Sequence, residues 1–569
     1  MIGRTARPAV GPALAFVLAL VASACGGTTA TPAPGDSQVS APVTPSAAAP
    51  SPDATEGASG GGVVSIGFES DIQYFDPALA YDVVSAAATR LLFDTLVQYD
   101  ASTGLEPGLA EAMPTVSADG RTYTFKLRPG VQFHKPDGSV LREMTADDVV
   151  ASLNRILDPN LKPTPSPVGP AFFAIIAGAQ EVLDGVAPTA SGIRAVDPLT
   201  VEIELTAPDK RLLNILAMGF GSVVPAEAGA DATAFGAAPI GTGPYHLTEY
   251  VQGEKAVFAR NDTYWGAMPP NAGAEIRIGL DANTQLQQAI AGDLDLMGDQ
   301  IPPGAFTATV NDPTLTDRIH RRTDVAVFYL SIDTSAPDSP LSDVRVRRAM
   351  NHAVDKDNLV KVQNGRGGPA HCILPPAMPG YDPTCQPYAY DVAKAQALMA
   401  DAGQSAGFTT QLYTDPSDLS KAMAEAIQAD LAKIGITAEI VLQEFDVLLG
   451  TITTPHQAPL VYIGWFQDFP DPSDFIDPVL SCAAAVAGGA NTSWYCNEEI
   501  DALSAAALAE QDDATRLAMY QDIQRRIMAD APWVPTTLSE TVEVVSDRVS
   551  GTYLHPVYPY DLRTIAVDG

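Results

Sequence analysis

The sequence predicts an α/β protein of two or more domains, and three observations lead to this fold class. The chain has 569 residues, more than a single hydrophobic core usually supports. From Gly407 onward, predicted strands and helices alternate, which implies a βαβ unit in a parallel sheet. The last segment, 541–560, is strand-rich and could return to an earlier domain. The alternating elements are a strand at 409–413, a helix at 419–434, a strand at 437–442 and a strand from Leu460.

The part before Gly407 contains the predicted elements of the earlier domain. Residues 62–68 have a buried-strand pattern, and Asp119-Gly120 is a hairpin signal before a period-two strand at 122–128. Thr145 precedes a helix at 149–157 as its cap. Further strands are predicted at 131–134, 200–205, 293–297 and 325–333. Further helices are predicted at 83–96, 281–292, 344–354, 390–402, 498–510 and 514–530.

The charge balance excludes one class of partner and favours another. The formal net charge is -35, and no basic stripe is present to neutralise phosphates, so nucleic acid is not an expected partner. Such acidity favours cationic over anionic ligands at long range. The alternative is that the acidity serves only solubility.

The first residues have the organisation of an export signal, predicted at 1–24. Arg4 and Arg7 form a positive region, and an apolar run follows at 9–22. The run ends in Ala22-Ser23-Ala24-Cys25, which is similar to a bacterial lipobox with Cys25 as the lipidated residue. An ordinary signal peptide with a chance cysteine is the alternative. Residues 25–62 lack aromatic side chains and predict a flexible linker, so the chain would be anchored to the outer face of the cytoplasmic membrane.

The four cysteines that follow Cys25 predict disulfides. Cys372 and Cys385 form one local pair, and Cys482 and Cys496 form another. In an exported protein, such pairs indicate two bridges that close short loops. A zinc site is the alternative, but the chain has no CxxC motif, and His371, beside Cys372, is the only imidazole near a cysteine in the sequence.

The strand that begins at Leu460 runs into an acidic and aromatic loop. Two prolines break the chain there, and the loop carries Asp468, Asp471 and Asp474 among aromatic residues. In open α/β sheets, ligands bind beyond the carboxyl ends of strands. We therefore expect this loop to bind something small and cationic, without chemistry.

Several segments together resemble a known family. They occur in the family's order, at 119–134, 241–245, 292–295, 343–355, the Trp465 loop and 531–535. The chain is similar to the extracellular solute-binding proteins of ABC importers, family 5 (cluster C), in a lipoprotein form. This group binds dipeptides, oligopeptides or nickel.

The resemblance implies a two-lobe, periplasmic-binding-protein-like fold (type II) with an extra inserted subdomain. Lobe I would be 63–320 plus 536–569, with the insertion at about 99–225, and lobe II would be 321–535. The lobes would close on a ligand by a hinge. The chain would be a monomer that delivers a di- or oligopeptide to permease subunits of an ABC transporter.

The resemblance also implies the ligand-binding residues. In the peptide binders, a Gly-Trp pair separated by two residues from an aspartate supplies the carboxylate for the ligand's α-ammonium, and Asp468 matches that position. Trp465 and Phe466 would supply apolar or cation–π surface. Tyr74 and Tyr81 lie where the N-terminal loop of the first lobe reaches the cleft. For these tyrosines the alternative is loop packing, for Asp468 it is a turn cap, and for Trp465 it is a place in the core.

Other functions are weighed against peptide binding. The same fold could bind a nickel chelate, an oligosaccharide or another cationic solute. Gly403-Gln404-Ser405-Ala406-Gly407 matches the GxSxG pattern of serine hydrolases, but it follows a helix and precedes a strand, whereas a nucleophile elbow needs the reverse order. The chain has no HExxH motif, and its seven histidines are scattered. We expect no enzyme activity, no cofactor and no metal.

Overall fold

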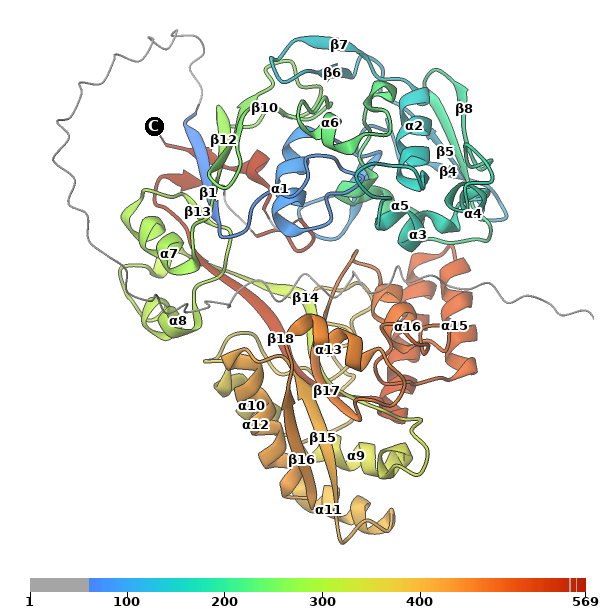
Figure 1. Ribbon diagram of the computed structural model, residues 1–569, viewed down its shortest axis with the longest axis vertical. Coiled ribbons are helices and arrows are strands. Elements are labelled where there is room, and N and C mark those ends of the chain that lie inside the picture. The colour runs from blue at the N-terminus through green and yellow to red at the C-terminus, as the bar shows by residue number, and fades with distance from the viewer. Residues whose placement is uncertain (1–60, 552–553, 559, 569) are drawn as a thin grey trace, which may run out of the picture.

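The computed structural model describes residues 61–551, 554–558 and 560–568. The predicted signal peptide, Cys25 and the linker up to residue 60 lie outside the described residues. The described chain forms two lobes, one above the other in Figure 1, with long strands running between them. This is the predicted two-lobe α/β fold. Within the described ranges, no helix is long and apolar enough to cross a membrane.

A five-stranded sheet with the order β10-β11-β12-β1-β13 forms the base of the first lobe. The first described strand, β1 (Val63–Phe68), lies parallel to β12 (Gly273–Ile278) and to β13 (Leu296–Met297). The sheet continues antiparallel through β11 (Lys255–Arg260) to β10 (Tyr245–Val251). The strands predicted at 62–68 and 293–297 are both present, and they are neighbours in this sheet.

Two helices of this lobe illustrate how local signals set helix ends. The helix α7 (Ala282–Ala291) begins at its N-cap Asp281 and ends at Gly292, which adopts a left-handed conformation with φ +82°. This agrees with the predicted helix at 281–292. The helix α1 (Val83–Leu92) is shorter than the predicted 83–96, because the backbone turns to an extended conformation at Phe93.

Between β1 and β10 the chain forms a smaller unit with its own sheet of order β4-β5-β9-β8. This unit lies in the upper right of Figure 1. Its helix α2 (Ala146–Leu157) begins with a capping box, in which the side chains of Thr145 and Asp148 bond each other's backbone N–H groups. The antiparallel strands are β4 (Thr115–Val116), β5 (Thr122–Lys126), β9 (Thr200–Glu204) and β8 (Ile193–Asp197).

The second lobe contains a mixed five-stranded sheet with the order β16-β15-β17-β14-β18. The strands β15 (Phe408–Thr414) and β16 (Ile436–Leu442) are parallel, and α12 (Asp418–Ala432) connects them. Strand β17 (Leu460–Phe466) is parallel to β15. The predicted βαβ unit is therefore present. The sheet is mixed because β14 runs antiparallel to both of its neighbours.

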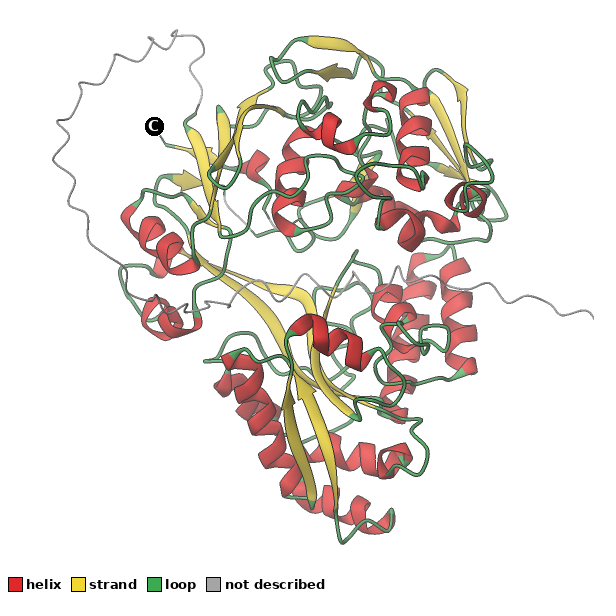
Figure 2. Cartoon of the chain, in the orientation of Figure 1, coloured by secondary structure: helices red, strands yellow, loops and turns green. Residues whose placement is uncertain are grey.

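Two long strands connect the lobes. They are β14 (Ile319–Ile332) and β18 (Trp533–Val544), which run diagonally across the centre of Figure 2. Their pairing shifts register between Thr323 and Val327 and again between Phe328 and Tyr329. Such bulges bend and twist a strand pair. The predicted lobe boundaries at 321 and 536 fall inside these two strands.

A buried carboxylate holds the shifted segment together. The side chain of Asp324 is 6% exposed and accepts hydrogen bonds from Ser539 and Thr541, both at 2.7 Å. The guanidinium of Arg322 donates to it at 2.8 Å and also bonds the His555 carbonyl at 2.6 Å. After β18 the chain returns to the core of the first lobe, where its buried side chains pack beside β1.

The remaining elements cover the sheets and close the ends of the lobes. In the first lobe they are β2 (Val97–Tyr99), β3 (Leu105–Pro107), β6 (Gln132–His134), β7 (Val140–Glu143), α3 (Val168–Phe172), α4 (Ala179–Leu183), α5 (Leu212–Ala217), α6 (Ala232–Gly236), α8 (Pro303–Val310), β19 (Val549–Ser550) and β20 (Ala566–Val567). In the second lobe they are α9 (Val344–Ala353), α10 (Lys356–Val362), α11 (Val392–Asp401), α13 (Phe445–Ile452), α14 (Asp477–Leu480), α15 (Glu498–Ala509) and α16 (Asp513–Asp530).

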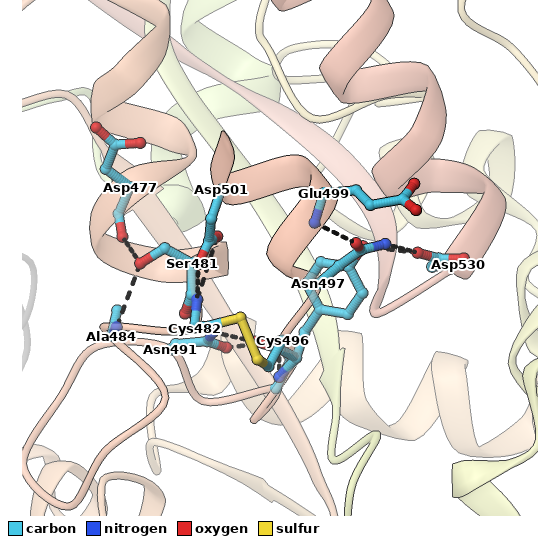
Figure 3. The surroundings of a disulfide bond; sticks show 12 residues. Asp477, Ser481, Cys482, Ala484, Asn491, Cys496, Asn497, Glu499, Asp501 and Asp530 are labelled. Atoms are coloured by element: carbon cyan, nitrogen blue, oxygen red, sulfur yellow. Dashed lines mark hydrogen bonds between the residues drawn. A yellow bond between two sulfur atoms is a disulfide. The ribbon is translucent and has the colours of Figure 1, made fainter. Parts of the chain in front are cut away.

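Both predicted disulfides are present. Cys372 bonds Cys385, and Cys482 bonds Cys496, which resolves the zinc alternative in favour of disulfides. Figure 3 shows the second bridge at the start of α15, where Asn491 spans its loop. The Asn491 amide donates to the carbonyls of Ser481 at 2.9 Å and Tyr495 at 2.8 Å. The loop is therefore held by the disulfide and by hydrogen bonds from the Asn491 side chain to backbone carbonyls.

Removing the second bridge should weaken the second lobe. Replacing Cys482 and Cys496 together by alanine frees a loop with a sequence separation of 14. The chain-entropy model then gives a loss of about 3 kcal/mol in the free energy of unfolding. Denaturant unfolding of the oxidised protein and the double variant measures this loss. The Cys372 and Cys385 pair, with a separation of 13, is a matched comparison. An unchanged free energy of unfolding would show that the bridge does not stabilise the second lobe.

Candidate functional site

The candidate site begins where β17 ends. Along this buried strand successive side chains alternate between the two faces of the sheet. Trp465 is 3% exposed and belongs to the apolar core on one face. Phe466 lies on the other face, where its ring meets Phe328 edge-on at a centroid distance of 5.8 Å. The two aromatic residues that the sequence predicts as ligand surface therefore point in opposite directions.

The turn after β17 is fixed by its own carboxylates. Asp471 caps the short 3₁₀ turn Pro472–Phe475 by accepting the backbone N–H of Ser473 at 3.0 Å. The side chain of Asp474 accepts the backbone N–H of Asp468 at 3.0 Å. These bonds hold Asp468 at the edge of the second lobe, where it faces the first.

Tyr81 crosses from the first lobe to meet Asp468. Its hydroxyl donates a hydrogen bond to the Asp468 carboxylate, although the two residues are 387 positions apart. The Tyr81 ring packs against Phe172 and Phe220, each at a centroid distance of 6.3 Å. The structure therefore brings together two of the predicted site residues, one from each lobe.

Tyr74 lies in the same loop before α1 as Tyr81. Its backbone N–H donates to the Ser85 hydroxyl at 3.1 Å, and its partly buried ring packs against the core of the inserted unit. This segment, together with Asp82 as N-cap of α1, fixes the loop that carries Tyr81.

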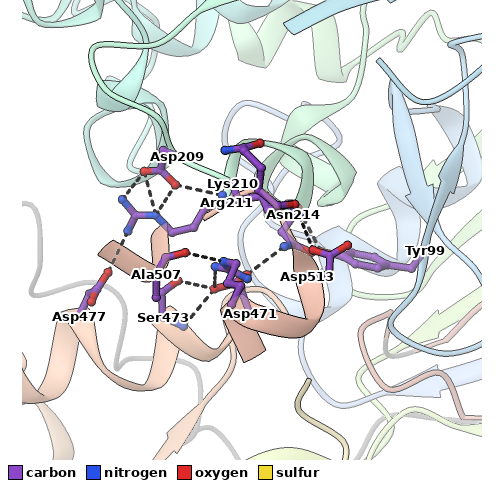
Figure 4. Close-up of polar contacts among 12 residues, drawn as sticks. Tyr99, Asp209, Lys210, Arg211, Asn214, Asp471, Ser473, Asp477, Ala507 and Asp513 are labelled. Atoms are coloured by element: carbon purple, nitrogen blue, oxygen red, sulfur yellow. Dashed lines mark hydrogen bonds and ion pairs between the residues drawn. The ribbon is translucent and has the colours of Figure 1, made fainter. Parts of the chain in front are cut away.

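Two further acidic side chains of the turn have arginine partners. Asp471 is 2% exposed and forms a two-point pair with Arg516 of α16, both contacts at 2.8 Å. Burial alone would raise the pKa of Asp471, but the charge and hydrogen bonds of Arg516 outweigh burial and lower it. Asp477 lies 3.5 Å from Arg211, which belongs to the first lobe. Figure 4 shows this pair and the approach of Asn214 to Asp471.

Asp468 and Asp474 are in a different electrostatic environment. Burial raises the pKa of Asp468 to about 6, partly offset by the hydrogen bonds from Tyr81 and Asp474. Burial, and next the charge of Asp468, raise the pKa of Asp474 well above its usual range. Within the described chain, no Lys, Arg or His forms an ion pair with either residue. A carboxylate in such a place gains most from a cationic ligand.

The lobes also touch beside the Tyr81–Asp468 contact. Phe469 meets Phe172 edge-on at a centroid distance of 5.9 Å. The Lys210 ammonium bonds Asp513 and donates to the Gln511 carbonyl at 2.7 Å. These contacts, with that between Arg211 and Asp477, form an interface on the side of the molecule away from β14 and β18 (Figure 1).

Sequence patterns did not identify Phe172, Phe220, Lys210 or Arg211 as parts of this interface. The two phenylalanines look like ordinary core residues of the inserted unit. The adjacent basic residues are a weak signal in an acidic chain, since Lys and Arg number 33 against 68 Asp and Glu. Ser405 of the GxSxG match lies between the end of α11 and the start of β15. That is the predicted helix-then-strand order, opposite to a nucleophile elbow.

Two α/β lobes that meet around a partly buried acidic site define a solute-binding protein of the periplasmic type. The model of the family described as bacterial extracellular solute-binding proteins, family 5 Middle, matches residues 104–486. The chain belongs to this family of bacterial extracellular solute-binding proteins.

Individual relatives agree with this assignment. The dipeptide-binding protein of Escherichia coli is 32% identical over 514 residues, which cover 87% of this chain and 92% of that protein. Heme-binding protein A of Haemophilus influenzae is also 32% identical, over 87% and 90% of the two chains. These relatives are named as binding proteins, not enzymes.

Solved structures show the same fold. HbpA2 from Haemophilus parasuis superposes with a TM-score of 0.79 at 27% identity, covering 89% of this chain and all of that one. DppA from Helicobacter pylori, in complex with the peptide STSA, has a TM-score of 0.70 at 28% identity, over 90% and 99% of the two chains.

Proposed function

We propose that this chain captures a short peptide between its lobes and delivers it to the permease subunits of an ABC transporter. The ligand's α-ammonium would pair with Asp468, and closure about β14 and β18 would bury it. The observation that carries the proposal is the position of Asp468, a partly buried carboxylate at the lobe interface whose described partners are Tyr81 and Asp474. The peptide-binding relatives support the same ligand class.

The geometry supports particular roles for the residues around Asp468. Tyr81 reaches Asp468 from the opposite lobe, so its hydroxyl would either share the carboxylate with the ammonium or yield to it. Trp465 packs behind the turn, and Phe466 and Tyr74 would contribute apolar surface at the edges of the site. Main-chain hydrogen bonds would supply affinity that does not depend on the peptide's sequence.

The proposal extends to the parts of the chain outside the described residues. Cys25 would carry the lipid anchor after removal of residues 1–24, and the linker would hold a monomer at the outer face of the cytoplasmic membrane. Lobe I would comprise 63–320 and 536–569, with the insertion at about 99–225, and lobe II would comprise 321–535.

A comparison of free and blocked peptides tests the proposal. Unblocked alanine peptides of two to five residues should stabilise the purified protein, by about 2.7 kcal/mol at a concentration of a hundred times Kd. The same peptides with an acetylated N-terminus lack the ammonium and should stabilise it far less. Thermal unfolding followed by calorimetry measures both. Equal effects of free and acetylated peptides would contradict the ammonium site.

Haem is a second candidate ligand, because Heme-binding protein A is as similar in sequence as the dipeptide-binding protein. Native mass spectrometry of the protein as purified distinguishes the candidates by the mass that accompanies it. A bound peptide supports the first proposal, and bound haem supports the second. A bound nickel chelate, oligosaccharide or other cationic solute would overturn both. Among the residues that the structure describes, no group of His, Cys, Asp and Glu could hold a metal ion.

A further inference from the structure

The carboxylates around the proposed ammonium site have unequal partners. Asp471 has Arg516, whose charge lowers the pKa of that carboxyl. Asp477 lies 3.5 Å from Arg211, which binds Asp209 more closely, and burial raises the pKa of Asp477 to about 6. Asp474 is 3% exposed, and in the described chain it forms no ion pair. The backbone N–H of Asp468 donates a hydrogen bond to its carboxylate at 3.0 Å. One buried acidic group next to Asp468 therefore lacks a counter-ion.

A second polar group beside Asp474 is also incompletely satisfied. Trp465 is 3% exposed, and its indole nitrogen has no hydrogen-bond partner among the described residues. The indole lies close enough to Asp474 to favour the charged form of that carboxyl slightly. The contact falls short of normal hydrogen-bond geometry, so the indole N–H offsets little of the cost of burying the Asp474 charge.

We propose that Asp474 is a positioning residue of the ligand site, and that Asp468 and Asp474 together hold one proton which a cationic ligand expels when it binds. The inference rests on the proposed function for its ligand, and it adds that peptide capture is linked to proton release. The bond from the Asp468 backbone to Asp474 carries the positioning role, because it fixes the loop that aims the Asp468 carboxylate.

Electrostatics explains why the empty site keeps a proton. Two buried carboxylates that share one turn repel each other when both are ionised, so one stays neutral until a counter-ion arrives. An α-ammonium is such a counter-ion. Its arrival favours the doubly ionised pair, and the proton leaves to solvent. Since the bound state holds fewer protons, affinity must rise with pH while the empty pair is still protonated.

The direction of the pKa shifts agrees with this linkage. The pKa of Asp468 is about 6 and that of Asp474 is raised well above its usual range, in both cases with burial as the largest cause. The proton that the ligand expels would thus come from Asp474. The other titratable groups that interact with the pair are Tyr81 and Tyr99 of the first lobe and Asp471 of the same turn. Four further groups interact with Asp471 and surround the pair at one remove: Arg211, Asp477, Arg516 and Tyr520.

The first experiment counts protons released on binding. Calorimetric titration of the wild-type protein with trialanine at pH 7, in two buffers of different ionisation enthalpy, should show release of a substantial part of one proton. Affinity should rise between pH 6.5 and 8, by at most about thirtyfold, the limit that one linked proton sets over 1.5 pH units. Asp474→Asn keeps an oxygen that can accept the Asp468 N–H. This variant should release almost no proton on binding, and its affinity should change by less than about threefold over the same pH range. Asp446→Asn, an exposed aspartate of α13, is the control and should behave as wild type.

The second experiment needs no ligand, and it separates failure of this inference from failure of the proposed function. Potentiometric titration of empty wild-type protein from pH 3 to 9 should show one group that titrates well above the usual range of an aspartate and that is absent from Asp474→Asn. Identical titrations, or a wild-type protein that binds trialanine without releasing protons, would overturn the inference. If no peptide binds at all, the proposed function fails, and the ligand-free titration alone tests whether the empty pair holds a proton.

Discussion

Replacing Asp468 by asparagine should weaken the binding of an unblocked peptide by about 2–5 kcal/mol, the range for truncating one partner of a buried charge pair. The side chain keeps its size and can still accept the Tyr81 hydroxyl, so the loss reports the missing charge. Titration calorimetry with trialanine at pH 7.5 measures the change in affinity. At this pH the carboxyl of Asp468, with its pKa of about 6, is ionised in most empty molecules.

Acetylated trialanine completes the comparison for Asp468. If the ammonium pairs with this carboxylate, acetylation should weaken binding to the wild-type protein and add little to the defect of Asp468→Asn. This pattern is a coupling between two specific groups, which a general loosening of the lobes would not produce. Two results would show that Asp468 does not bind the ammonium: an unchanged affinity in Asp468→Asn, or a loss on acetylation that is as large in the variant as in the wild-type protein.

Local sequence patterns predicted most of the elements that position the site. The apolar run of β17 and the prolines after it located the turn, and the alternation from Gly407 predicted the βαβ unit. Period-two alternation also implies that Trp465 and Phe466 cannot both face one ligand. The structure places them on opposite faces of β17, so their proposed roles differ: Trp465 supports the turn, and Phe466 can offer its edge to solvent or ligand.

Long-range contacts were beyond such patterns. Nothing local to Tyr81 indicates a partner 387 residues away, and only the family resemblance placed it at the cleft. Arg516 illustrates the opposite difficulty. A charged residue in the first turn of a predicted helix usually lies in solvent, yet this side chain is 6% exposed. Its burial depends on Asp471, whose position is set by the Pro472–Phe475 turn.

Replacing Arg516 by methionine should lower the free energy of unfolding by about 3–5 kcal/mol, because it leaves the Asp471 carboxylate buried without a counter-ion. The pair is buried on both sides, with side-chain exposures of 6% and 3%. The Arg516 guanidinium also donates to the Ala507 carbonyl at 3.0 Å, which ties α16 to α15. Denaturant unfolding at pH 7 measures the loss. Arg526→Met is a matched control on the same helix, since Arg526 pairs with Asp522 at the surface and should change stability by less than about 1 kcal/mol.

The pH dependence of the Arg516→Met defect distinguishes its electrostatic cause from lost packing. In the wild-type protein the pKa of Asp471 is lowered, so the pair stabilises the fold above the unfolded pKa and this contribution is lost as the pH falls through the folded pKa. Without Arg516, burial raises that pKa, and protonation below it relieves the penalty. The difference between wild type and variant should therefore shrink from pH 7 to pH 4, and Asp471→Asn should restore much of the stability of Arg516→Met at pH 7. A defect that stays constant with pH, and that Asp471→Asn does not relieve, would mean that Arg516 acts by packing alone.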